Sequence, residues 1–267
     1  MALTKVIGDG LGGTNDLTVD TTTLTVDATN NRVGIGSATP TKVLDITESA
    51  SADTGQLKLT YDGGDGNRAG FILKNTHTGG REYGIYAGNN STGGGLGNSL
   101  GIADNTASTA YRLLIDSAGA VTMPSQPAFS AHKNGTDQSN VATTESTVTW
   151  THERFDNNAD FDLDNNRFVA PVTGKYFLQI QVRLENLDTA AGYYIINITT
   201  SNEVYNFILD PDYFDSDAVY YSIASSVLAD MDANDTASIV VIQSGGTAQT
   251  DIDGNQEYTW FSGHLVC

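Results

Sequence analysis

The chain has 267 residues, enough for one large domain or two modest ones, and we expect at least two. Threonine, asparagine, aspartate, serine and 28 glycines are plentiful while helix-forming residues are scarce, which predicts an all-β protein. Its 32 acidic and 13 basic residues give a net charge of -19. Because so few lysines and arginines cannot replace the counterions of a phosphate backbone, nucleic acid is excluded as the expected partner.

The sequence contains no membrane-span signal, since no apolar run approaches the ~20 residues needed to cross a bilayer. The opening MALTKVIGDGLGG has neither the charged start nor the apolar stretch of a signal peptide, so we expect a soluble chain that is not conventionally secreted. Cys267 is the only cysteine, which excludes an internal disulfide and a thiolate metal cluster. We expect a small apolar end residue there, with a reactive or interchain thiol as the alternative.

The first 50 residues are rich in short strand patterns. The sequence LTVD occurs at residues 17–20 and again at 24–27, bounded each time by turn-forming residues. Residues 24–36 share with residues 113–124 the order strand, aspartate-led turn, strand, and both segments predict β-hairpins. Hairpins this short cannot bury an apolar face on their own, so we expect copies of the same chain to complete them.

Between residues 56 and 108, strand patterns alternate with glycine-rich loops. The strand patterns are QLKLTYD, AGFILKN, REYGIYA and NSLGIAD, and the run STGGGLGNS at residues 91–99 predicts a flexible loop or a wide turn. Such strands suit either a small β-sandwich or a broad trimeric β-prism. The sequence predicts the strands more firmly than their arrangement.

The composition changes near Ser125, where strand patterns become longer and richer in aromatic residues. Candidate strands cover residues 128–133, 147–154, 167–170, 175–186, 192–200, 203–209, 218–228, 237–243 and 256–266. Strands at this spacing, separated by polar turns over roughly 140 residues, predict a jelly-roll β-sandwich.

Residues 167–184 carry the strongest strand pattern of the chain. Phe168, Val172 and Tyr176 stand at even positions, as do the aliphatic residues that follow, while lysine, glutamine and arginine stand between them. This alternation is strand periodicity with one face in the core and the other in solvent. Residues 171–174, which include proline and glycine, cannot continue a ladder and predict a tight corner between a short strand and a long one.

The same region resembles a known family. The phrase F-x-A-P-x-x-G-x-Y, with F-S-G-x-L at the end of the chain, is similar to the C1q-like branch of the C1q and tumour necrosis factor superfamily of trimeric jelly rolls. The matching residues are Phe168, Ala170, Pro171, Gly174, Tyr176, Phe261, Ser262, Gly263 and Leu265. PAFSAHKN at residues 127–134 resembles the opening of that domain. The resemblance implies a trimerising jelly-roll head over residues 125–267.

A second resemblance covers the other half of the chain. Residues 31–46, 74–88 and 100–124 resemble segments of bacteriophage tail fibres and related virion fibres, which are generally elongated homotrimers. The resemblance implies an attachment or shaft segment over residues 1–50, which would dock on another virion protein, and a β-rich fibre domain over residues 51–124. It also implies that the protein is made in the host cytoplasm and located in the virion.

Cofactor and metal patterns are weak. GDGLGG at residues 8–13 satisfies G-x-G-x-x-G, but a strand pattern follows it instead of the helix that a dinucleotide site requires. The four histidines are far apart in the sequence, so we expect strand or loop residues rather than ligands. Asp160, Asp162 and Asp164 invite calcium, but they complete no EF-hand loop, and solvated turn residues are the preferred interpretation, with calcium as the alternative.

One acidic loop carries aromatic residues outside any strand pattern. Residues 210–217 read DPDYFDSD, and no alternation places the two aromatic residues in the core. Exposed aromatic side chains flanked by carboxylates suit stacking on sugars or burial at a protein contact. Asp212, Tyr213, Phe214 and Asp215 are therefore candidate contacts with a receptor, and packing against an adjacent subunit is the competing interpretation.

These observations favour a binding protein. No nucleophile elbow, H-E-x-x-H or nucleophile with a local base is present in the sequence, so we expect no enzyme. The main hypothesis is a homotrimeric phage tail fibre whose C1q-like head binds a host surface protein or glycan, without membrane insertion. The alternative is a structural virion protein, such as a head-decorating fibre or a tail adaptor, whose head binds other virion proteins. A fibre-borne depolymerase is the third class.

Overall fold

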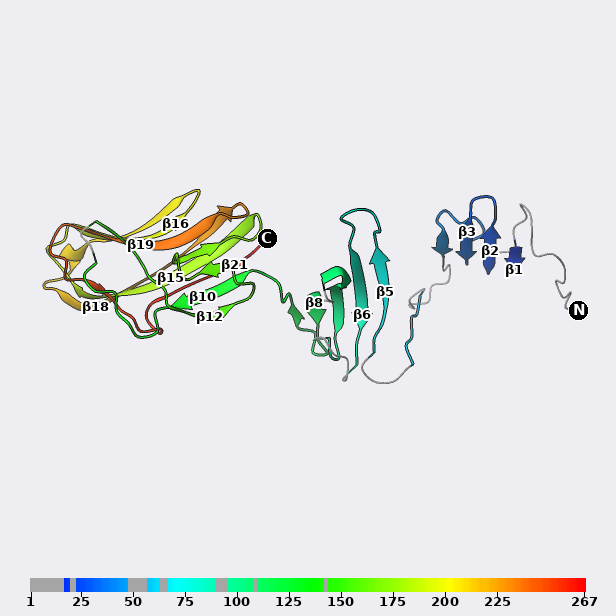
Figure 1. Ribbon diagram of the computed structural model, residues 1–267, viewed down its shortest axis with the longest axis horizontal. Coiled ribbons are helices and arrows are strands. Elements are labelled where there is room, and N and C mark those ends of the chain that lie inside the picture. The colour runs from blue at the N-terminus through cyan, green and yellow to red at the C-terminus, as the bar shows by residue number, and fades with distance from the viewer. Residues whose placement is uncertain are drawn as a thin grey trace, which may run out of the picture. The chain divides into compact units, whose positions relative to one another are not determined.

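The structure is a computed structural model, and it describes residues 17–19, 23–47, 57–62, 67–89, 96–107, 110–141 and 144–267 (Figure 1). The regular elements in these residues are β-strands and two 3-10 helices of three residues each, so the all-β prediction is confirmed. No helix in this part of the chain is long and apolar enough to cross a membrane. The chain divides into two compact units, residues 1–64 and 65–267. The domain boundaries expected near residues 50 and 125 stay predictions.

The N-terminal unit contains one four-stranded sheet with the order β1-β2-β3-β4. Its strands are β1 (Leu17–Val19), β2 (Leu24–Asp27), β3 (Arg32–Ile35) and β4 (Leu44–Ile46). β2 and β3 form the predicted hairpin, whose turn is closed by Asp27: its carboxylate accepts hydrogen bonds from the N–H and the side-chain amide of Asn30 at 3.0 and 2.8 Å. β3 and β4 run parallel, so a loop must cross one face of the sheet to connect them.

The second unit begins with an antiparallel sheet of five strands in sequence order, which we call the middle sheet. Its elements are β5 (Ala69–Lys74), β6 (Glu82–Ala87), β7 (Leu100–Asp104), η1 (Asn105–Ala107), β8 (Ala110–Ile115) and β9 (Val121–Thr122). The predicted hairpin of β8 and β9 is confirmed, with Asp116 accepting bonds from the N–H groups of Ala118 and Ala120.

The strand predicted at residues 56–62 is wrong over residues 57–62, which lie in no strand. Its alternation is that of a strand, but a strand also needs a neighbouring edge to accept its ladder hydrogen bonds. Leu57, Leu59 and Tyr61 are consequently exposed in the single chain, at 63%, 47% and 49%. The middle sheet is likewise a single layer, so of the two arrangements considered, the small sandwich and the trimeric β-prism, the described residues of one chain do not form the sandwich.

Residues 128–265 form two further sheets, which face each other in the head (Figure 1). The first sheet has the order β12-β10-β21-β15-β18, with β20 also paired to β15. Its strands are β10 (Ala128–His132), β12 (His152–Asp156), β15 (Gly174–Leu187), β18 (Ala218–Met231), β20 (Asp251–Ile252) and β21 (Trp260–Leu265).

The second sheet of the head has the order β13-β14-β19-β16-β17, with β11 also paired to β19. Its strands are β11 (Glu145–Thr147), β13 (Phe161–Asp162), β14 (Arg167–Val169), β16 (Tyr193–Thr200), β17 (Val204–Leu209) and β19 (Thr236–Ser244); η2 (Pro211–Tyr213) follows β17. From β14 onward the chain passes repeatedly from one sheet to the other. This topology is the predicted jelly-roll sandwich.

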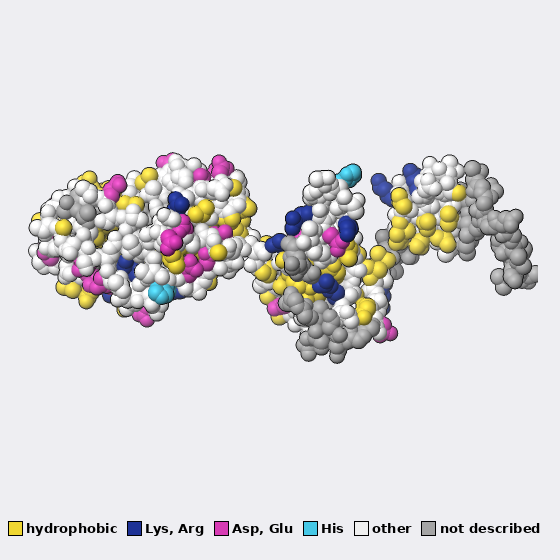
Figure 2. Space-filling model, in the orientation of Figure 1, with side chains coloured by type: hydrophobic (Ala, Val, Ile, Leu, Met, Phe, Trp, Pro, Cys, Tyr) yellow, Lys and Arg dark blue, Asp and Glu magenta, His cyan; other side chains and the backbone are white. Residues whose placement is uncertain are grey.

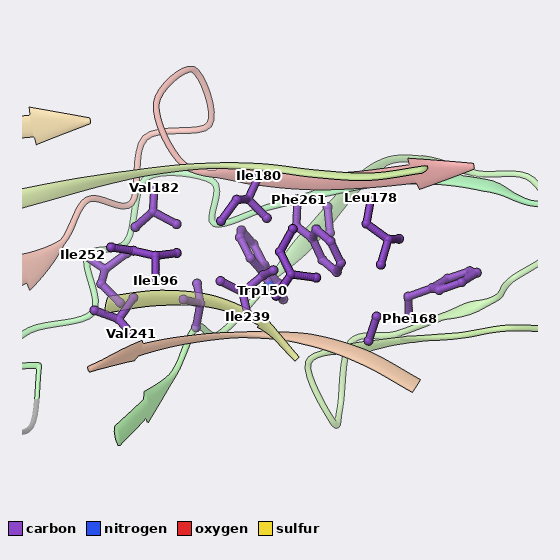
Figure 3. Close-up of a cluster of buried hydrophobic side chains, with 14 of the residues drawn as sticks. Trp150, Phe168, Leu178, Ile180, Val182, Ile196, Ile239, Val241, Ile252 and Phe261 are labelled. Carbon is purple, nitrogen blue, oxygen red and sulfur yellow. The ribbon is translucent and has the colours of Figure 1, made fainter. Parts of the chain in front are cut away.

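The core lies between these two sheets. On β15 the even-numbered residues Tyr176 to Leu184 are at most 1% exposed, as the alternation predicts, whereas Val172 in the preceding corner is 45% exposed. Figure 3 shows Leu178, Ile180 and Val182 of the first sheet pointing toward Ile196, Ile239 and Val241 of the second. Because these side chains come from distant parts of the sequence, their burial holds the head together as one unit.

A cluster of phenylalanines fills one part of this core. The ring of Phe129 stacks on Phe168 at a centroid distance of 4.6 Å and contacts Phe161 and Phe261 at 5.0 Å each. Gly263, next to them on β21, has no space for a side chain, since a Cβ there would lie 2.7 Å from Leu178 and 2.9 Å from Phe129. The glycine of the F-S-G phrase is therefore required by packing.

The single strand predicted at residues 147–154 is wrong. β11 ends at Thr147 in the second sheet and β12 begins at His152 in the first, so the chain changes sheets between them. Val148 and Trp150 are both buried in this crossing, and the N–H of Trp150 donates to Asn166 Oδ1 at 2.7 Å. Alternation within one segment cannot reveal which sheet each half joins.

Replacing Phe129 by alanine should lower the free energy of unfolding by about 3–5 kcal/mol, because it removes a fully buried ring and leaves a cavity among three others. Denaturant unfolding of the full-length protein measures the change. Phe155→Ala on β12 is the matched control, since Phe155 is 51% exposed and should cost less than about 1 kcal/mol. Equal losses for the two variants would contradict the core described above.

Candidate functional site

The loop between β17 and β18, residues 210–217, contains the candidate contact residues. Its first half is η2: the N–H of Asp212 donates to Asp210 Oδ1 at 3.0 Å, and the N–H of Phe214 donates to the Pro211 carbonyl at 3.0 Å. An aspartate cap followed by proline is a favourable start for such a turn. Pro211 is buried and fixes the loop to the head.

The structure gives the two aromatic residues of this loop different environments. Tyr213 is 93% exposed, with the exposed carboxylates of Asp212 and Asp215 on either side of it in the chain. Phe214 is half-buried, and its ring packs edge-to-face against Tyr221 of β18 at 5.3 Å. Tyr213 and the two aspartates are therefore accessible to a partner, whereas Phe214 packs against the core of the head.

Hydrogen bonds join this loop to two others. The N–H and hydroxyl of Thr189 donate to Asp217 Oδ1 at 2.9 and 2.7 Å, and the Gln249 amide donates to Asp217 Oδ2 at 2.8 Å. The Thr189 N–H is the main reason that the pKa of Asp217 lies below its usual value. Because the base of the loop is held by charge-assisted bonds, less conformational freedom is lost when a partner contacts Tyr213.

A second cluster of polar groups lies on the first sheet, around Arg183. Its guanidinium forms an ion pair with Asp253, lies 3.6 Å from Glu185 Oε1, and is stacked 3.6 Å from the centre of the Tyr258 ring and 4.7 Å from that of Tyr220. The backbone brings Asp253 there because β20 pairs with β15 immediately before it. Asp253 is 2% exposed, and Arg183 is its ion-pair partner in this buried position.

Glu185 is the group in this cluster that titrates near neutrality. Burial, followed by hydrogen bonding and repulsion from Asp253 and by the charge of Asp137, raises its pKa to about 7, while Arg183 opposes the rise. The proton that Glu185 holds below this pKa removes its repulsion from Asp253. Beside them, Asn134, Asp137 and Asn255 help to line a hollow of about 330 Å³.

Arg183, Glu185 and Asp253 are not among the site residues that the sequence pattern indicates. Alternation along β15 places Arg183 and Glu185 on the same outward face of the strand. This is the sequence feature that could have indicated part of the cluster. Nothing in the sequence indicates that Asp253, about 70 residues later, lies against them, because that contact depends on the pairing of β20 with β15.

The three aspartates considered for calcium have separate surroundings. Asp162 accepts two hydrogen bonds from Asn165 and lies 3.5 Å from Arg167, Asp160 accepts one from Asn158, and Asp164 is exposed. Within the described ranges, no three histidine, cysteine or acidic side chains are arranged to hold a metal ion. Calcium stays an untested alternative.

The structure does bring together two of the histidines. The rings of His132 and His152, on the paired strands β10 and β12, lie 5.8 Å apart, and burial is the main cause that lowers the pKa of His132. His77 and His264 are not part of this pair. Cys267 carries a free, exposed thiol. The alternative of a reactive or interchain thiol stays a prediction.

Comparison with known proteins finds likeness in fold. The sequence matches no protein-family model and no curated protein. The globular domain of zebrafish complement 1qA protein is 19% identical with a TM-score of 0.40, and the similarity covers 53% of this chain and 98% of that one. Murine APRIL at pH 8.5 is 11% identical with a TM-score of 0.39, covering 53% and 99%. The similarity concerns the C-terminal half, and the relation to phage fibres stays a prediction.

The stability of the head should fall as pH rises from about 5 to about 7, in part because of Glu185. Its pKa is raised in the folded state, so the folded protein binds the extra proton in this range and loses that stabilisation as the proton leaves. Glu185→Gln keeps the neutral form, so its free energy of unfolding should fall less over the same range, by an amount on the order of 1 kcal/mol after allowance for solvent screening, and its melting temperature should drop less. Parallel thermal melts that decline identically would refute the assignment.

Proposed function

We propose that this chain is a homotrimeric bacteriophage tail fibre protein whose jelly-roll head binds a host surface receptor. The observation that carries the binding role is Tyr213, a 93% exposed aromatic residue on a loop held by hydrogen bonds. A rigid, exposed tyrosine offers a large contact area at little entropic cost, as binding hot spots do. The resemblance of residues 31–46, 74–88 and 100–124 to fibre segments supports the location in a virion.

The edge of the sandwich supports self-association of the head. β17 and β18 are the last strands of their sheets, and their core-facing residues, among them Phe207, Tyr221 and Ile223, are only half-buried. The corresponding residues of β15 are almost fully buried. Val219 on β18 is 62% exposed on the same side as Tyr221 and Ile223. A neighbouring copy that packs along this edge would complete the burial.

Three copies give the attachment mechanism. Each head would present one Tyr213 loop, and several modest contacts on one particle multiply into strong binding through effective concentration. With -19 charges per chain the trimer is strongly acidic, which favours a sugar, a protein or a cation-bridged target over a bare anionic surface. Asp212 and Asp215 would then act as hydrogen-bond acceptors beside the ring.

The remaining parts of the proposal concern the other end of the chain. An N-terminal segment within residues 1–50 would dock on another virion protein; residues 1–16 lie outside the described residues. Binding requires no catalytic group, nucleic acid or membrane insertion, so the protein acts as a non-enzymatic adhesin. A structural role between virion proteins would use the same exposed loop, and the binding test below separates the two.

Tyr213→Ala should weaken attachment of the purified protein to susceptible bacterial cells by at least about tenfold, since it removes a hot-spot side chain from every copy. Its melting temperature should stay near that of the parent, because the ring contacts little in the head. Phe155→Ala, which removes another exposed aromatic side chain, controls for nonspecific hydrophobic binding. Binding by the variant at parental strength would exclude the Tyr213 loop, and binding to purified virions in place of cells would favour the structural role.

Light scattering of the full-length protein should give the mass of three chains of 28.3 kDa each. The measurement is made in moderate salt, where repulsion between acidic subunits is screened. A folded protein with the mass of a single chain would contradict the proposed trimer.

A further inference from the structure

One face of the middle sheet consists of apolar side chains. The register places Phe71, Ile85, Ile102 and Leu113 side by side across four strands. The neighbouring rows on the same face add Leu73, Tyr83, Ala69, Ala87, Leu100, Ile115 and Val121. We call these residues the apolar face of the middle sheet.

This face is open to solvent in the single chain. Phe71, Leu73, Leu100 and Val121 are between 44% and 61% exposed. Asp104 stands at its rim, where Arg81 and Arg112 pair with the carboxylate. In the space-filling view, hydrophobic side chains gather over the middle sheet, whereas they are scattered over the visible side of the head (Figure 2). A contiguous apolar patch of this kind on a soluble protein marks an interaction surface.

The opposite face of the middle sheet is covered over β6, β7 and β8 by its own side chains, while Ile72 on the edge strand β5 stays exposed. Tyr86, Leu96, Ala103 and Tyr111 form a buried cluster there. Arg68 stacks 4.0 Å from the centre of the Tyr86 ring and donates to the Tyr111 hydroxyl at 2.9 Å. Glycine at position 101 lets Leu96 and Tyr111 approach the backbone, since a Cβ would lie 2.7 Å from each. The sheet therefore has one face left to cover.

The N-terminal sheet has the same asymmetry. By register, one face of β2, β3 and β4 carries Leu24, Val26, Val33, Ile35, Leu44 and Ile46. On the other face Thr25 and Pro40 are buried, and Arg32 donates to the Pro40 carbonyl at 2.9 Å, so the β3–β4 loop covers that side. In both the N-terminal sheet and the middle sheet, loops and side chains of the same chain thus cover the polar or glycine-rich face, and the apolar face is left exposed to solvent.

We propose that the apolar face of the middle sheet packs against the same face of other copies of this chain. A single-layer sheet is not stable in water unless a second layer covers its apolar face, so the layer must be present whenever the chain is folded. Another copy is available in equal amount and offers the same apolar face. The charged group at its rim, Asp104, is paired with Arg81 and Arg112, so contact there would not bury an unpaired carboxylate. The inference rests on the proposed trimer and names the surface that would hold its fibre part together.

The test compares two adjacent positions of β5 in the full-length protein. Leu73 and Ile72 are 61% and 54% exposed in the single chain but lie on opposite faces of the sheet. Leu73→Cys and Ile72→Cys, each combined with Cys267→Ser, would be labelled with a maleimide under native conditions. Packing between copies should slow labelling at position 73 by at least about tenfold relative to position 72.

The outcomes separate this surface from the proposed function. A trimer in which both cysteines react at equal rates overturns the packing and leaves the trimeric head intact. Protection of position 73 in a protein with the mass of one chain also overturns it, and identifies a segment of the same chain, such as residues 57–62, as the cover.

A second pair of variants tests the same surface without cysteine, in case a cysteine substitution unfolds the sheet locally. Phe71→Ser should lower the unfolding temperature and make it more dependent on protein concentration, because it weakens contacts between subunits. Ile72→Ser, on the opposite face of the same strand, should leave the concentration dependence of the parent unchanged. A concentration-independent loss in Phe71→Ser would show that the face is covered from within its own chain or by a different protein, and would reject the proposal.

Discussion

The constraint on which this protein depends is that every β-sheet must cover its apolar face. In the head the two sheets meet this requirement together: side chains of β15 and β21 pack against those of β16 and β19, and the Phe129 cluster fills the space between them. This burial is contained in one chain. The head therefore has a stable core that does not depend on how its connecting loops are used.

A stable core leaves the loops available for binding. The Tyr213 loop is attached to the head through Pro211, Phe214 and Asp217, and its tyrosine projects into solvent. The Arg183 cluster has the opposite character, since the charges of Glu185 and Asp253 are close together and partly buried. Burial and the neighbouring Asp253 raise the pKa of Glu185 to about 7.

The sheets before the head meet the same constraint in another way. The N-terminal sheet and the middle sheet each close one face with their own loops and side chains, and each leaves a face of aliphatic and aromatic residues open. Association of several chains would close these faces and bring several Tyr213 loops together. One physical requirement would thus link the stability of these two sheets to the number of exposed loops in one assembly.

Local patterns in the sequence determined the strand content, the alternation of β15, the corner at residues 171–174 and the hairpins of β2–β3 and β8–β9, because these depend on neighbouring residues alone. The sequence also singled out the Tyr213 loop. Only the tertiary structure decided that Phe214 packs against Tyr221 while Tyr213 stays exposed, that residues 147–154 divide between two sheets, and that Asp253 meets Arg183 and Glu185. Each of these depends on pairing between strands that are far apart in the sequence. Side-chain alternation within a strand shows which side chains share a face, but it does not identify the strand that pairs with it.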